Sequence, residues 1–346
     1  MGGDSVSLPA LVVESAGVPV EATINLGRIA DDLAGAGQRA ARSKSTNTLR
    51  AYTGAWAVFE RYCLERSCSA LPAHPATVAA FLDWRSLLPV SQYVGDPLHA
   101  PSLSTVTTAF SAIAHYHHAA GIASPTDHPQ VQAVLEGITR DLGKLARHPK
   151  VPVLIDDLLK LAAAHQEDMS LAWKRDWAVL LVGFASSLRR SNIAALTVED
   201  IEFLPRGIHL LVRKEKVDQH GEGRLVGILR RPILCPVRTL EAWIQAAGIT
   251  TGPVFRGLTK WQTPRKSAMS PATVDVIVKT HMGALGYVVS AYGAHSLRSG
   301  FATEAAAKGR TLKQIMDQGG WTEPKTAQKY MRKATLFDNN PTDILP

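Results

Sequence analysis

Residues that could act on a phosphodiester occur in four separate segments of the C-terminal half of this 346-residue chain. The segments read SSLRRSNIAAL, RKEKVDQ, AHSLRSG and GGWTEPKTAQKYMR. In AHSLRSG the histidine and the arginine are three residues apart, so on a helix both face the same way. The residues that we select as catalytic candidates are Arg189, Lys216, His295, Arg298, Trp321 and Tyr330.

These side-chain types are sufficient for strand cleavage at phosphorus. The pentacoordinate transition state carries extra charge on its non-bridging oxygens, which Arg189 and Arg298 could clamp through bidentate hydrogen bonds. The phenol of Tyr330 has an ordinary pKa of about 10, so a base such as His295 must take its proton before the oxygen attacks. A lysine on a hairpin can protonate the departing 5′ oxygen, and we assign that role to Lys216.

The proposed chemistry requires no cofactor. A phosphotyrosine ester conserves the energy of the broken bond, so a second hydroxyl can reverse the step without ATP. Two guanidinium groups supply the charge stabilisation that Mg²⁺ provides in two-metal nucleases. The histidines of HYHH, residues 115–118, lack a nearby carboxylate or cysteine that would complete a metal site. We therefore expect no metal and no small-molecule cofactor.

Helical periodicity predicts the scaffold that positions these residues. Residues 43–142 are expected to form a helical core domain, and residues 155–346 a second domain that carries the catalytic candidates. Residues 1–42 are expected to be a flexible tail, and the basic, proline-containing segment 143–154 a linker. Two strands, His209–Arg213 and Arg224–Leu229, flank a glycine-containing turn. The predicted fold is mainly α: an N-terminal helical bundle plus a mixed α+β catalytic domain with a small antiparallel sheet.

Composition excludes several classes of protein. The hydrophobic fraction is 46%, which is too high for a disordered chain. No apolar run has the length of a membrane helix and the first residues lack the basic start of a signal peptide, so we expect a soluble cytoplasmic protein. Three cysteines without paired spacing argue against both a disulfide framework and a structural zinc site.

The net charge of +8 is concentrated beyond residue 40. Residues 1–40 contain five acidic and two basic residues, a net charge of −3, so the remainder carries +11. A basic body indicates a polyanionic partner such as nucleic acid. A basic surface that serves only solubility fits the charge equally well.

Taken in order, the four segments resemble the motifs of the tyrosine recombinases, also called phage integrases. The matching residues are LRRSNIAAL, KVDQ, HSLR and the GGW whose tryptophan lies nine residues before Tyr330. The resemblance covers about residues 43–335 and is strongest over the second domain. By position it implies an active site of Arg189, Lys216, His295, Arg298, Trp321 and the nucleophile Tyr330. Lys214 remains an alternative to Lys216, because residues two apart on a strand share a face.

Two positions characterise this sequence within the family. Trp321 resembles the Cre-like members, whereas many relatives have a second histidine there. An indole N–H can donate to a phosphate oxygen but cannot shuttle a proton, so proton transfer falls to His295 and Lys216. Asn192 stands three residues after Arg189, where relatives usually carry a Glu or Asp that orients the site, and the amide supplies no charge for that role.

The resemblance also implies how the protein meets its substrate. Family members grip double-stranded DNA as a C-shaped clamp, and four protomers assemble on two sites of paired half-sites, so we expect a homotetramer at the nucleoid. Apolar residues of the C-terminal tail would pack against a neighbouring protomer: Leu336, Phe337, Ile344 and Leu345. Weaker expectations for DNA contact are Lys44, Arg50, Arg61, Arg66, Ser104, Thr105 and Thr108.

The sequence therefore predicts a site-specific DNA recombinase that cleaves and rejoins strands through a 3′-phosphotyrosine intermediate. One alternative is a non-catalytic DNA-binding accessory protein of the same fold. Another is a type IB topoisomerase, which shares the chemistry but needs no partner site. The helical N-terminal bundle favours the recombinase.

Overall fold

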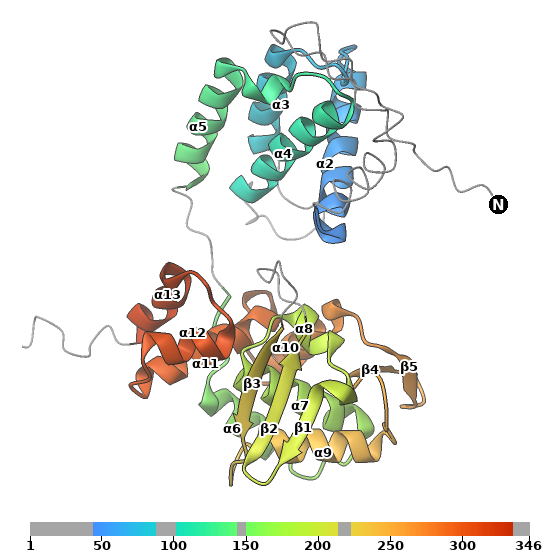
Figure 1. Cartoon of the computed structure of the whole chain (residues 1–346), viewed down its shortest axis with the longest axis vertical. Helices are drawn as coiled ribbons and strands as arrows, with labels where there is room; N and C mark the ends of the chain where they lie inside the picture. Colours follow the sequence, from blue (N-terminus) through green and yellow to red (C-terminus); the bar gives the residue numbers. More distant parts are fainter. Residues whose placement is uncertain (1–43, 88–101, 144–149, 214–222, 335–346) are drawn as a thin grey trace, which may run out of the picture. The chain divides into compact units, whose positions relative to one another are not determined.

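The computed structural model describes residues 44–87, 102–143, 150–213 and 223–334 (Figure 1). Residue contacts divide the chain into two compact units, Met1–Arg147 and His148–Pro346. The predicted tail 1–42, Lys214, Lys216 and the four apolar tail residues from Leu336 onwards lie outside the described residues. No helix in the described ranges has the length and apolar character needed to cross a bilayer.

The first unit is a bundle of four α-helices, α2 (Thr46–Glu65), α3 (Pro75–Leu87), α4 (Leu103–Ala119) and α5 (Pro129–Gly143). Helix α2 begins where the Ser45 hydroxyl accepts a hydrogen bond from the backbone N–H of Thr48 at 3.1 Å, an N-cap. Apolar residues at helical spacing, among them Trp56 and Phe59, point into a core that α3, α4 and α5 complete.

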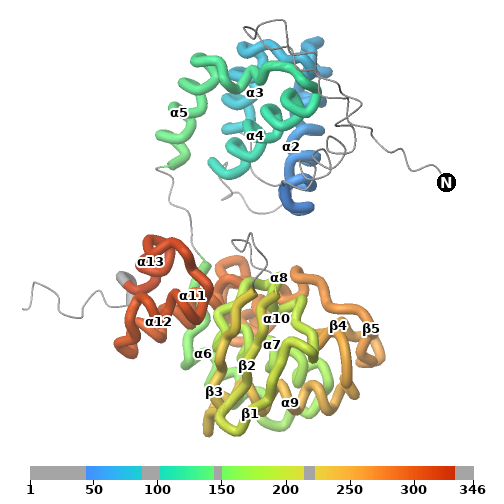
Figure 2. The backbone as a smooth tube through the Cα atoms, viewed as in Figure 1, coloured from blue at the N-terminus to red at the C-terminus, as the bar shows by residue number. Residues whose placement is uncertain are grey.

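The second unit contains helices around a small sheet (Figure 2). Its helices are α6 (Ile155–Ala164), α7 (Leu171–Ser186), α8 (Arg190–Ala195), α9 (Pro236–Ala246), α10 (Pro271–Ala284), α11 (Ala294–Ala307), α12 (Leu312–Gly319) and α13 (Pro324–Ala334). The three-stranded sheet has the order β1 (Ile201–Leu204), β2 (Gly207–Val212), β3 (Arg224–Leu229), and a separate hairpin pairs β4 (Arg256–Leu258) with β5 (Pro264–Ala268). The predicted fold class is confirmed.

All strand pairs in the described residues are antiparallel. In the β2–β3 ladder Gly207 pairs with Leu229 and Val212 with Arg224, so the segment that joins the two strands contains Lys216. The sequence prediction placed β3 at its observed bounds but placed β2 at His209–Arg213 and missed β1, β4 and β5. The sequences of β1, β4 and β5 do not alternate cleanly between apolar and polar residues. Short strands of this kind are stabilised by pairing with their neighbours, so their own sequence pattern is weak.

The second unit has two separate hydrophobic clusters. The larger one, the main core, packs α7, α9 and α10 against the sheet and includes Leu297 of α11. The smaller one, the satellite core, consists of Ala302, Ala306, Ile315, Trp321 and Ala327, with Tyr330 and Met331 packed against it. Helix α11 therefore contributes to both cores, whereas α12 and α13 belong to the satellite core. Figures 1 and 2 show α11, α12 and α13 side by side at one edge of the unit.

Candidate active site

The end of α7 places Arg189 at the site. Ser187 adopts a left-handed backbone conformation (φ 53°) as the C-cap of α7, which turns the chain sharply. Arg189 is then the N-cap of α8, where its carbonyl accepts from the N–H groups of Asn192 and Ile193. The adjacent Arg190 is exposed and faces Asp275 at 4.0 Å.

The first turn of α11 carries His295 and Arg298. Asp275 of α10 anchors this end, because its carboxylate accepts from the backbone N–H of Ala294 at 2.9 Å. Burial alone would raise the pKa of Asp275, but this N–H together with Lys279 and Arg190 lowers it below its ordinary value. An ionised carboxylate at a helix N-terminus stabilises the helix that presents the two candidates.

Arg298 is buried, with 3% of its surface exposed. Its Nη1 donates to the carbonyl oxygens of Ser187 and Gly319, which end α7 and α12. Its guanidinium carbon lies 3.9 Å from the centre of the Trp321 ring, a cation–π contact. Arg298 thereby joins two helix C-termini, and its positive charge offsets the partial negative charge of their last carbonyls.

The two glycines before Trp321 have different physical roles. A Cβ on Gly319 would lie 2.0 Å from the Trp321 ring, so only glycine permits this approach. Gly320 adopts φ 65° and caps α12, which favours glycine because it has no Cβ. Together they turn the chain so that Trp321 packs under Arg298, with 8% of its surface exposed.

Tyr330 lies on α13 and meets His295 within the same chain. The phenolic oxygen and His295 Nε2 are 2.6 Å apart, and the rings of Tyr330 and Trp321 are 6.1 Å apart. The structure thus brings together His295, Arg298, Trp321 and Tyr330. These four residues come from the start of α11, the turn after α12, and α13.

Burial favours the neutral forms of both His295 and Tyr330. Desolvation, followed by the nearby charges of Arg298 and Arg189, lowers the pKa of His295 below its ordinary value. Desolvation raises the pKa of Tyr330, and Arg298 partly opposes that rise. A neutral imidazole can act as a base, and the protonated phenol that it faces carries the proton that it would accept.

Lys216, a catalytic candidate, and Asn192, a departure from the family pattern, are not joined to this site by described contacts. Lys216 lies in the segment 214–222, outside the described residues. Asn192 has an amide nitrogen that is buried without a hydrogen-bond partner in the described part of the chain, and its carbonyl oxygen accepts from the Ser191 hydroxyl at 3.3 Å. Asn192 therefore does not supply the carboxylate contact that relatives usually have.

The expected DNA contacts form no single patch. Lys44 and Arg50 lie at the start of α2, whereas Arg61 and Arg66 lie near its end, and a 20-residue helix spans about 30 Å. Arg66 stacks on Tyr62 at 3.9 Å. The three α4 residues do gather, since a hollow of about 310 Å³ is lined by Ser104, Thr105, Thr108, Arg85 and parts of α2. Arg85 is a basic neighbour of these hydroxyls that sequence reasoning missed.

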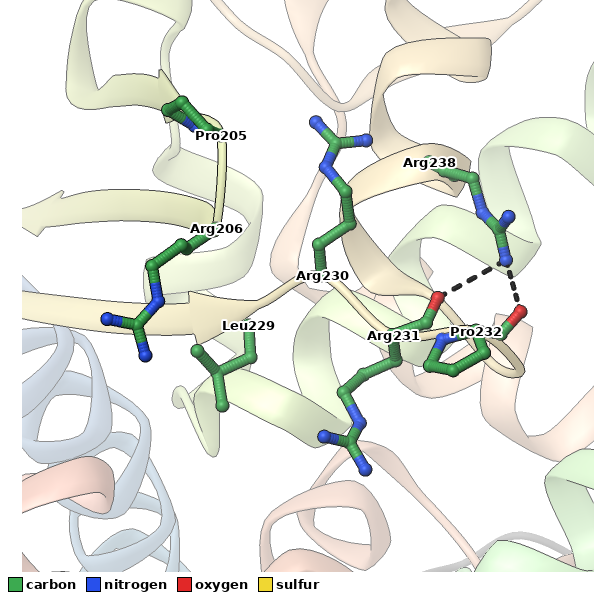
Figure 3. Close-up of a pocket in the computed structure, with 7 residues that line it drawn as sticks. All are labelled: Pro205, Arg206, Leu229, Arg230, Arg231, Pro232 and Arg238. Atoms are coloured by element: carbon green, nitrogen blue, oxygen red, sulfur yellow. Dashed lines mark hydrogen bonds between the residues drawn. The ribbon is translucent and has the colours of Figure 1, made fainter.

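Another basic surface lies away from the candidate site. Arg206, Arg230, Arg231 and Arg238 border a hollow of about 520 Å³ at the β1–β2 turn (Figure 3). Arg206 directly precedes β2, so the hollow lies one strand length, about 20 Å, from the end of β2 at Val212. Figure 3 shows the guanidinium groups directed apart, and Arg230 already pairs with Glu241 at 2.7 Å. This geometry does not form a single anion site.

Comparison with known proteins extends these observations. A family model described as the phage integrase family matches residues 155–336. The chain is 33% identical over 308 residues to an integrase/recombinase xerD homolog of Selenomonas ruminantium, across 88% of this chain and 86% of that protein. It is 24% identical over 249 residues to recombinase cre of Escherichia phage P1, across 67% and 71% of the two chains.

A solved structure shows the same fold. The Tn1549 transposon integrase in complex with transposon right end DNA superposes with a TM-score of 0.56 at 17% identity. The match covers 85% of this chain and 92% of that one. At this level of identity the likeness concerns the arrangement of the elements.

Proposed function

This chain belongs to the phage integrase family, and on that premise we propose that it is a site-specific DNA recombinase that acts through a covalent bond between Tyr330 and a 3′ phosphate. The observation that supports this most directly is the 2.6 Å separation of the Tyr330 hydroxyl from His295 Nε2, beside the buried Arg298. A nucleophile, its base and a phosphate-binding cation are then neighbours in one subunit.

The proposed cleavage step follows from these positions. Arg298 and Arg189 bind the non-bridging oxygens and stabilise the charge that develops on them. His295 accepts the phenolic proton as the Tyr330 oxygen bonds to phosphorus. The bond from phosphorus to the 5′ oxygen breaks, and Lys216 donates the proton that this oxygen needs. The Trp321 indole N–H is assigned as a further donor to the phosphate.

The reverse reaction rejoins a strand. A 5′ hydroxyl attacks the phosphotyrosine ester, and the same groups return the proton to Tyr330. Because the ester conserves the bond energy and two guanidinium groups carry the charge stabilisation, we propose that the reaction needs neither ATP nor a metal ion. Strand transfer that persists in EDTA supports this, and loss that Mg²⁺ restores contradicts it.

A nicked suicide duplex tests the proposed function. The binding site is first selected from a random-sequence duplex library. Nicks are then placed at successive positions so that the short fragment carrying the released 5′ hydroxyl diffuses away. We expect a denaturation-resistant protein–DNA complex whose DNA-bearing peptide contains Tyr330. Site-specific binding without any covalent complex would instead indicate the non-catalytic accessory protein. Strand relaxation without site preference would indicate the topoisomerase.

The rate of cleavage should fall on acidification below the ordinary histidine range. Because its pKa is lowered, His295 stays neutral until the pH drops below its usual value of about 6.5, and only the neutral ring can accept the Tyr330 proton. Single-turnover trapping between about pH 5 and pH 8 measures the midpoint.

His295→Gln is the control for this pH profile. Glutamine can hydrogen-bond the Tyr330 hydroxyl but cannot take its proton, so we expect a cleavage rate about 10²- to 10⁴-fold lower. The fall in rate at acidic pH that is due to His295 should be absent from the pH profile of this variant. A midpoint above the ordinary histidine pKa, or an unchanged inflection in His295→Gln, contradicts the assignment of the base.

We further propose that the first unit provides DNA contacts and that the protein recombines DNA as a homotetramer on two sites. Lys44, Arg50, Arg61, Arg66, Ser104, Thr105 and Thr108 remain proposals for those contacts. Arg85 joins them because it shares the hollow of the three α4 hydroxyls.

A surface groove supports the proposed assembly. It has a volume of about 1010 Å³ and lies between β3, α6, α11 and α12. Leu225, Leu229 and Ile233 line it, with 57–71% of their surfaces exposed, an unusual cost for aliphatic side chains that face only water. We assign the apolar tail of a second copy, through Leu336, Phe337, Ile344 and Leu345, as its occupant.

Leu225→Glu should prevent assembly on paired sites while leaving single-site binding unchanged. A carboxylate in the groove must be desolvated when an apolar segment binds, which disfavours the complex. Met169→Glu is the matched control, because Met169 is 72% exposed and lies outside the groove. Sedimentation of complexes on DNA with one or two sites measures the outcome, and unimpaired two-site assembly by Leu225→Glu contradicts the proposed contact.

A further inference from the structure

The last turn of α12 is held by hydrogen bonds that link it to β3 and α7. Arg224 Nη1 donates to the carbonyl oxygens of Asp317 at 2.8 Å and Gln318 at 2.9 Å. The Gln318 side-chain nitrogen donates in turn to the carbonyl oxygens of Ala185 at 2.9 Å and Gly227 at 3.0 Å. We call these four hydrogen bonds the α12 clasp.

The clasp joins three elements that meet at the candidate site. Ala185 lies in the last turn of α7, two residues before the Ser187 turn that leads to Arg189. Arg224 is the first residue of β3 and forms the last described pair of the ladder with Val212. The clasped turn itself continues through the two glycines to Trp321. The clasp therefore ties the backbone that carries one phosphate-binding candidate to the backbone that carries another.

The clasp connects parts of the unit that pack in two separate cores. Tyr330 and Trp321 pack in the satellite core with α12 and α13, whereas the end of α7 belongs to the main core. Apolar packing inside the satellite core is non-directional, so it does not fix how that core sits against α7. Besides α11, which passes through both cores, the hydrogen bonds of Arg298 and of the clasp are directional contacts between the satellite core and the rest of the unit.

The clasp also has an electrostatic consequence. The last carbonyls of a helix carry partial negative charge, and here they lie beside a site that we propose binds phosphate. Arg224 binds the carbonyls of Asp317 and Gln318, while Arg298 binds that of Gly319. Charge-assisted hydrogen bonds of this kind offset the negative end of α12.

We propose that Arg224 and Gln318 are positioning residues for strand cleavage. They hold the satellite core, and with it Tyr330, so that the phenolic oxygen stays in line with the bound phosphate. This inference rests on the proposed function, since it concerns the rate of the Tyr330 reaction. Neither residue contacts the reacting atoms in our assignment. Displacing a nucleophile by about 1 Å costs about 100-fold in rate. We therefore propose that the clasp acts on the rate of cleavage and not on the affinity for DNA.

Gln318→Ala tests the clasp directly. Alanine keeps helix propensity but removes both amide hydrogen bonds, and we expect cleavage of the suicide duplex to slow by about 10- to 100-fold with DNA Kd within about twofold of the unsubstituted chain. Arg224→Gln should act in the same direction, and Arg224→Lys should recover part of the rate because an ammonium can still donate to the carbonyls.

Lys313→Ala is the matched control on the same helix. Its side chain is 84% exposed, and its ammonium pairs with the side chain of Asp317, outside the clasp, so its removal should leave the rate unchanged. Circular dichroism establishes that every variant is folded at the assay temperature. A uniform loss of DNA affinity and rate in Gln318→Ala would show a merely structural role and overturn the proposal.

A 5′-bridging phosphorothiolate duplex separates nucleophile positioning from leaving-group protonation. A thiolate leaves without a proton, so the deficit of Gln318→Ala should persist on this substrate, and its disappearance would overturn the proposal. The unsubstituted chain is the reference in each assay. If it forms no covalent complex, the proposed function fails. If it does and Gln318→Ala matches its rate, only the positioning role fails.

Discussion

Replacing Tyr330 with phenylalanine should abolish covalent capture of DNA while leaving duplex affinity within about twofold of the unsubstituted chain. The ring keeps its place in the satellite core and its contact with Trp321, 6.1 Å between centres. Only the hydroxyl that faces His295 Nε2 is lost, and with it the proposed nucleophile. We expect the rate on the suicide duplex to fall by at least about 10³-fold, below detection in a gel assay.

Tyr292→Phe controls for the loss of a phenolic hydroxyl from the same unit. Tyr292 is buried at 7% exposure, near the start of α11 but not among the proposed catalytic residues. The Tyr292→Phe variant should still form the covalent complex with the suicide duplex. A covalent complex that persists in Tyr330→Phe, with the DNA on a different peptide, would show that another residue is the nucleophile.

Arg298→Gln should have the second-largest effect, because this side chain has both chemical and structural partners. Removal of one charged donor at a transition-state oxygen costs about 10²- to 10³-fold in rate. Glutamine is also too short to serve the carbonyls of both Ser187 and Gly319, and leaving buried carbonyls unsatisfied costs about 1–3 kcal/mol in the free energy of unfolding. Single-turnover cleavage and chemical denaturation measure the two losses separately.

Arg190→Gln is the matched control for Arg298→Gln. Arg190 is 55% exposed and 4.0 Å from Asp275, so its removal should change stability and rate only slightly. Arg298→Lys distinguishes charge from geometry, since an ammonium keeps the charge but not the planar fork. Cleavage by Arg298→Gln at the rate of Arg190→Gln would remove Arg298 from the proposed mechanism.

Much of the scaffold could be predicted because its signals are local. The N-terminal helical bundle could be predicted, since proline starts both α3 (Pro75–Leu87) and α5 (Pro129–Gly143) and apolar residues recur at helical spacing. The family could be predicted because four short motifs occur in a fixed order. By contrast, β1 was missed, because its pairing with β2 depends on a partner strand and not on its own alternation.

The sequence alone determined which residue types are available for chemistry and on which helices they stand: the three-residue spacing of His295 and Arg298 places both on one face of α11. Only the tertiary structure decided what surrounds them. Arg298 binds the carbonyls of Ser187, 111 residues away, and of Gly319, and the α12 clasp likewise ends on backbone oxygens. Every residue has such a carbonyl, so no pattern of side chains marks the few that fold against a guanidinium or an amide.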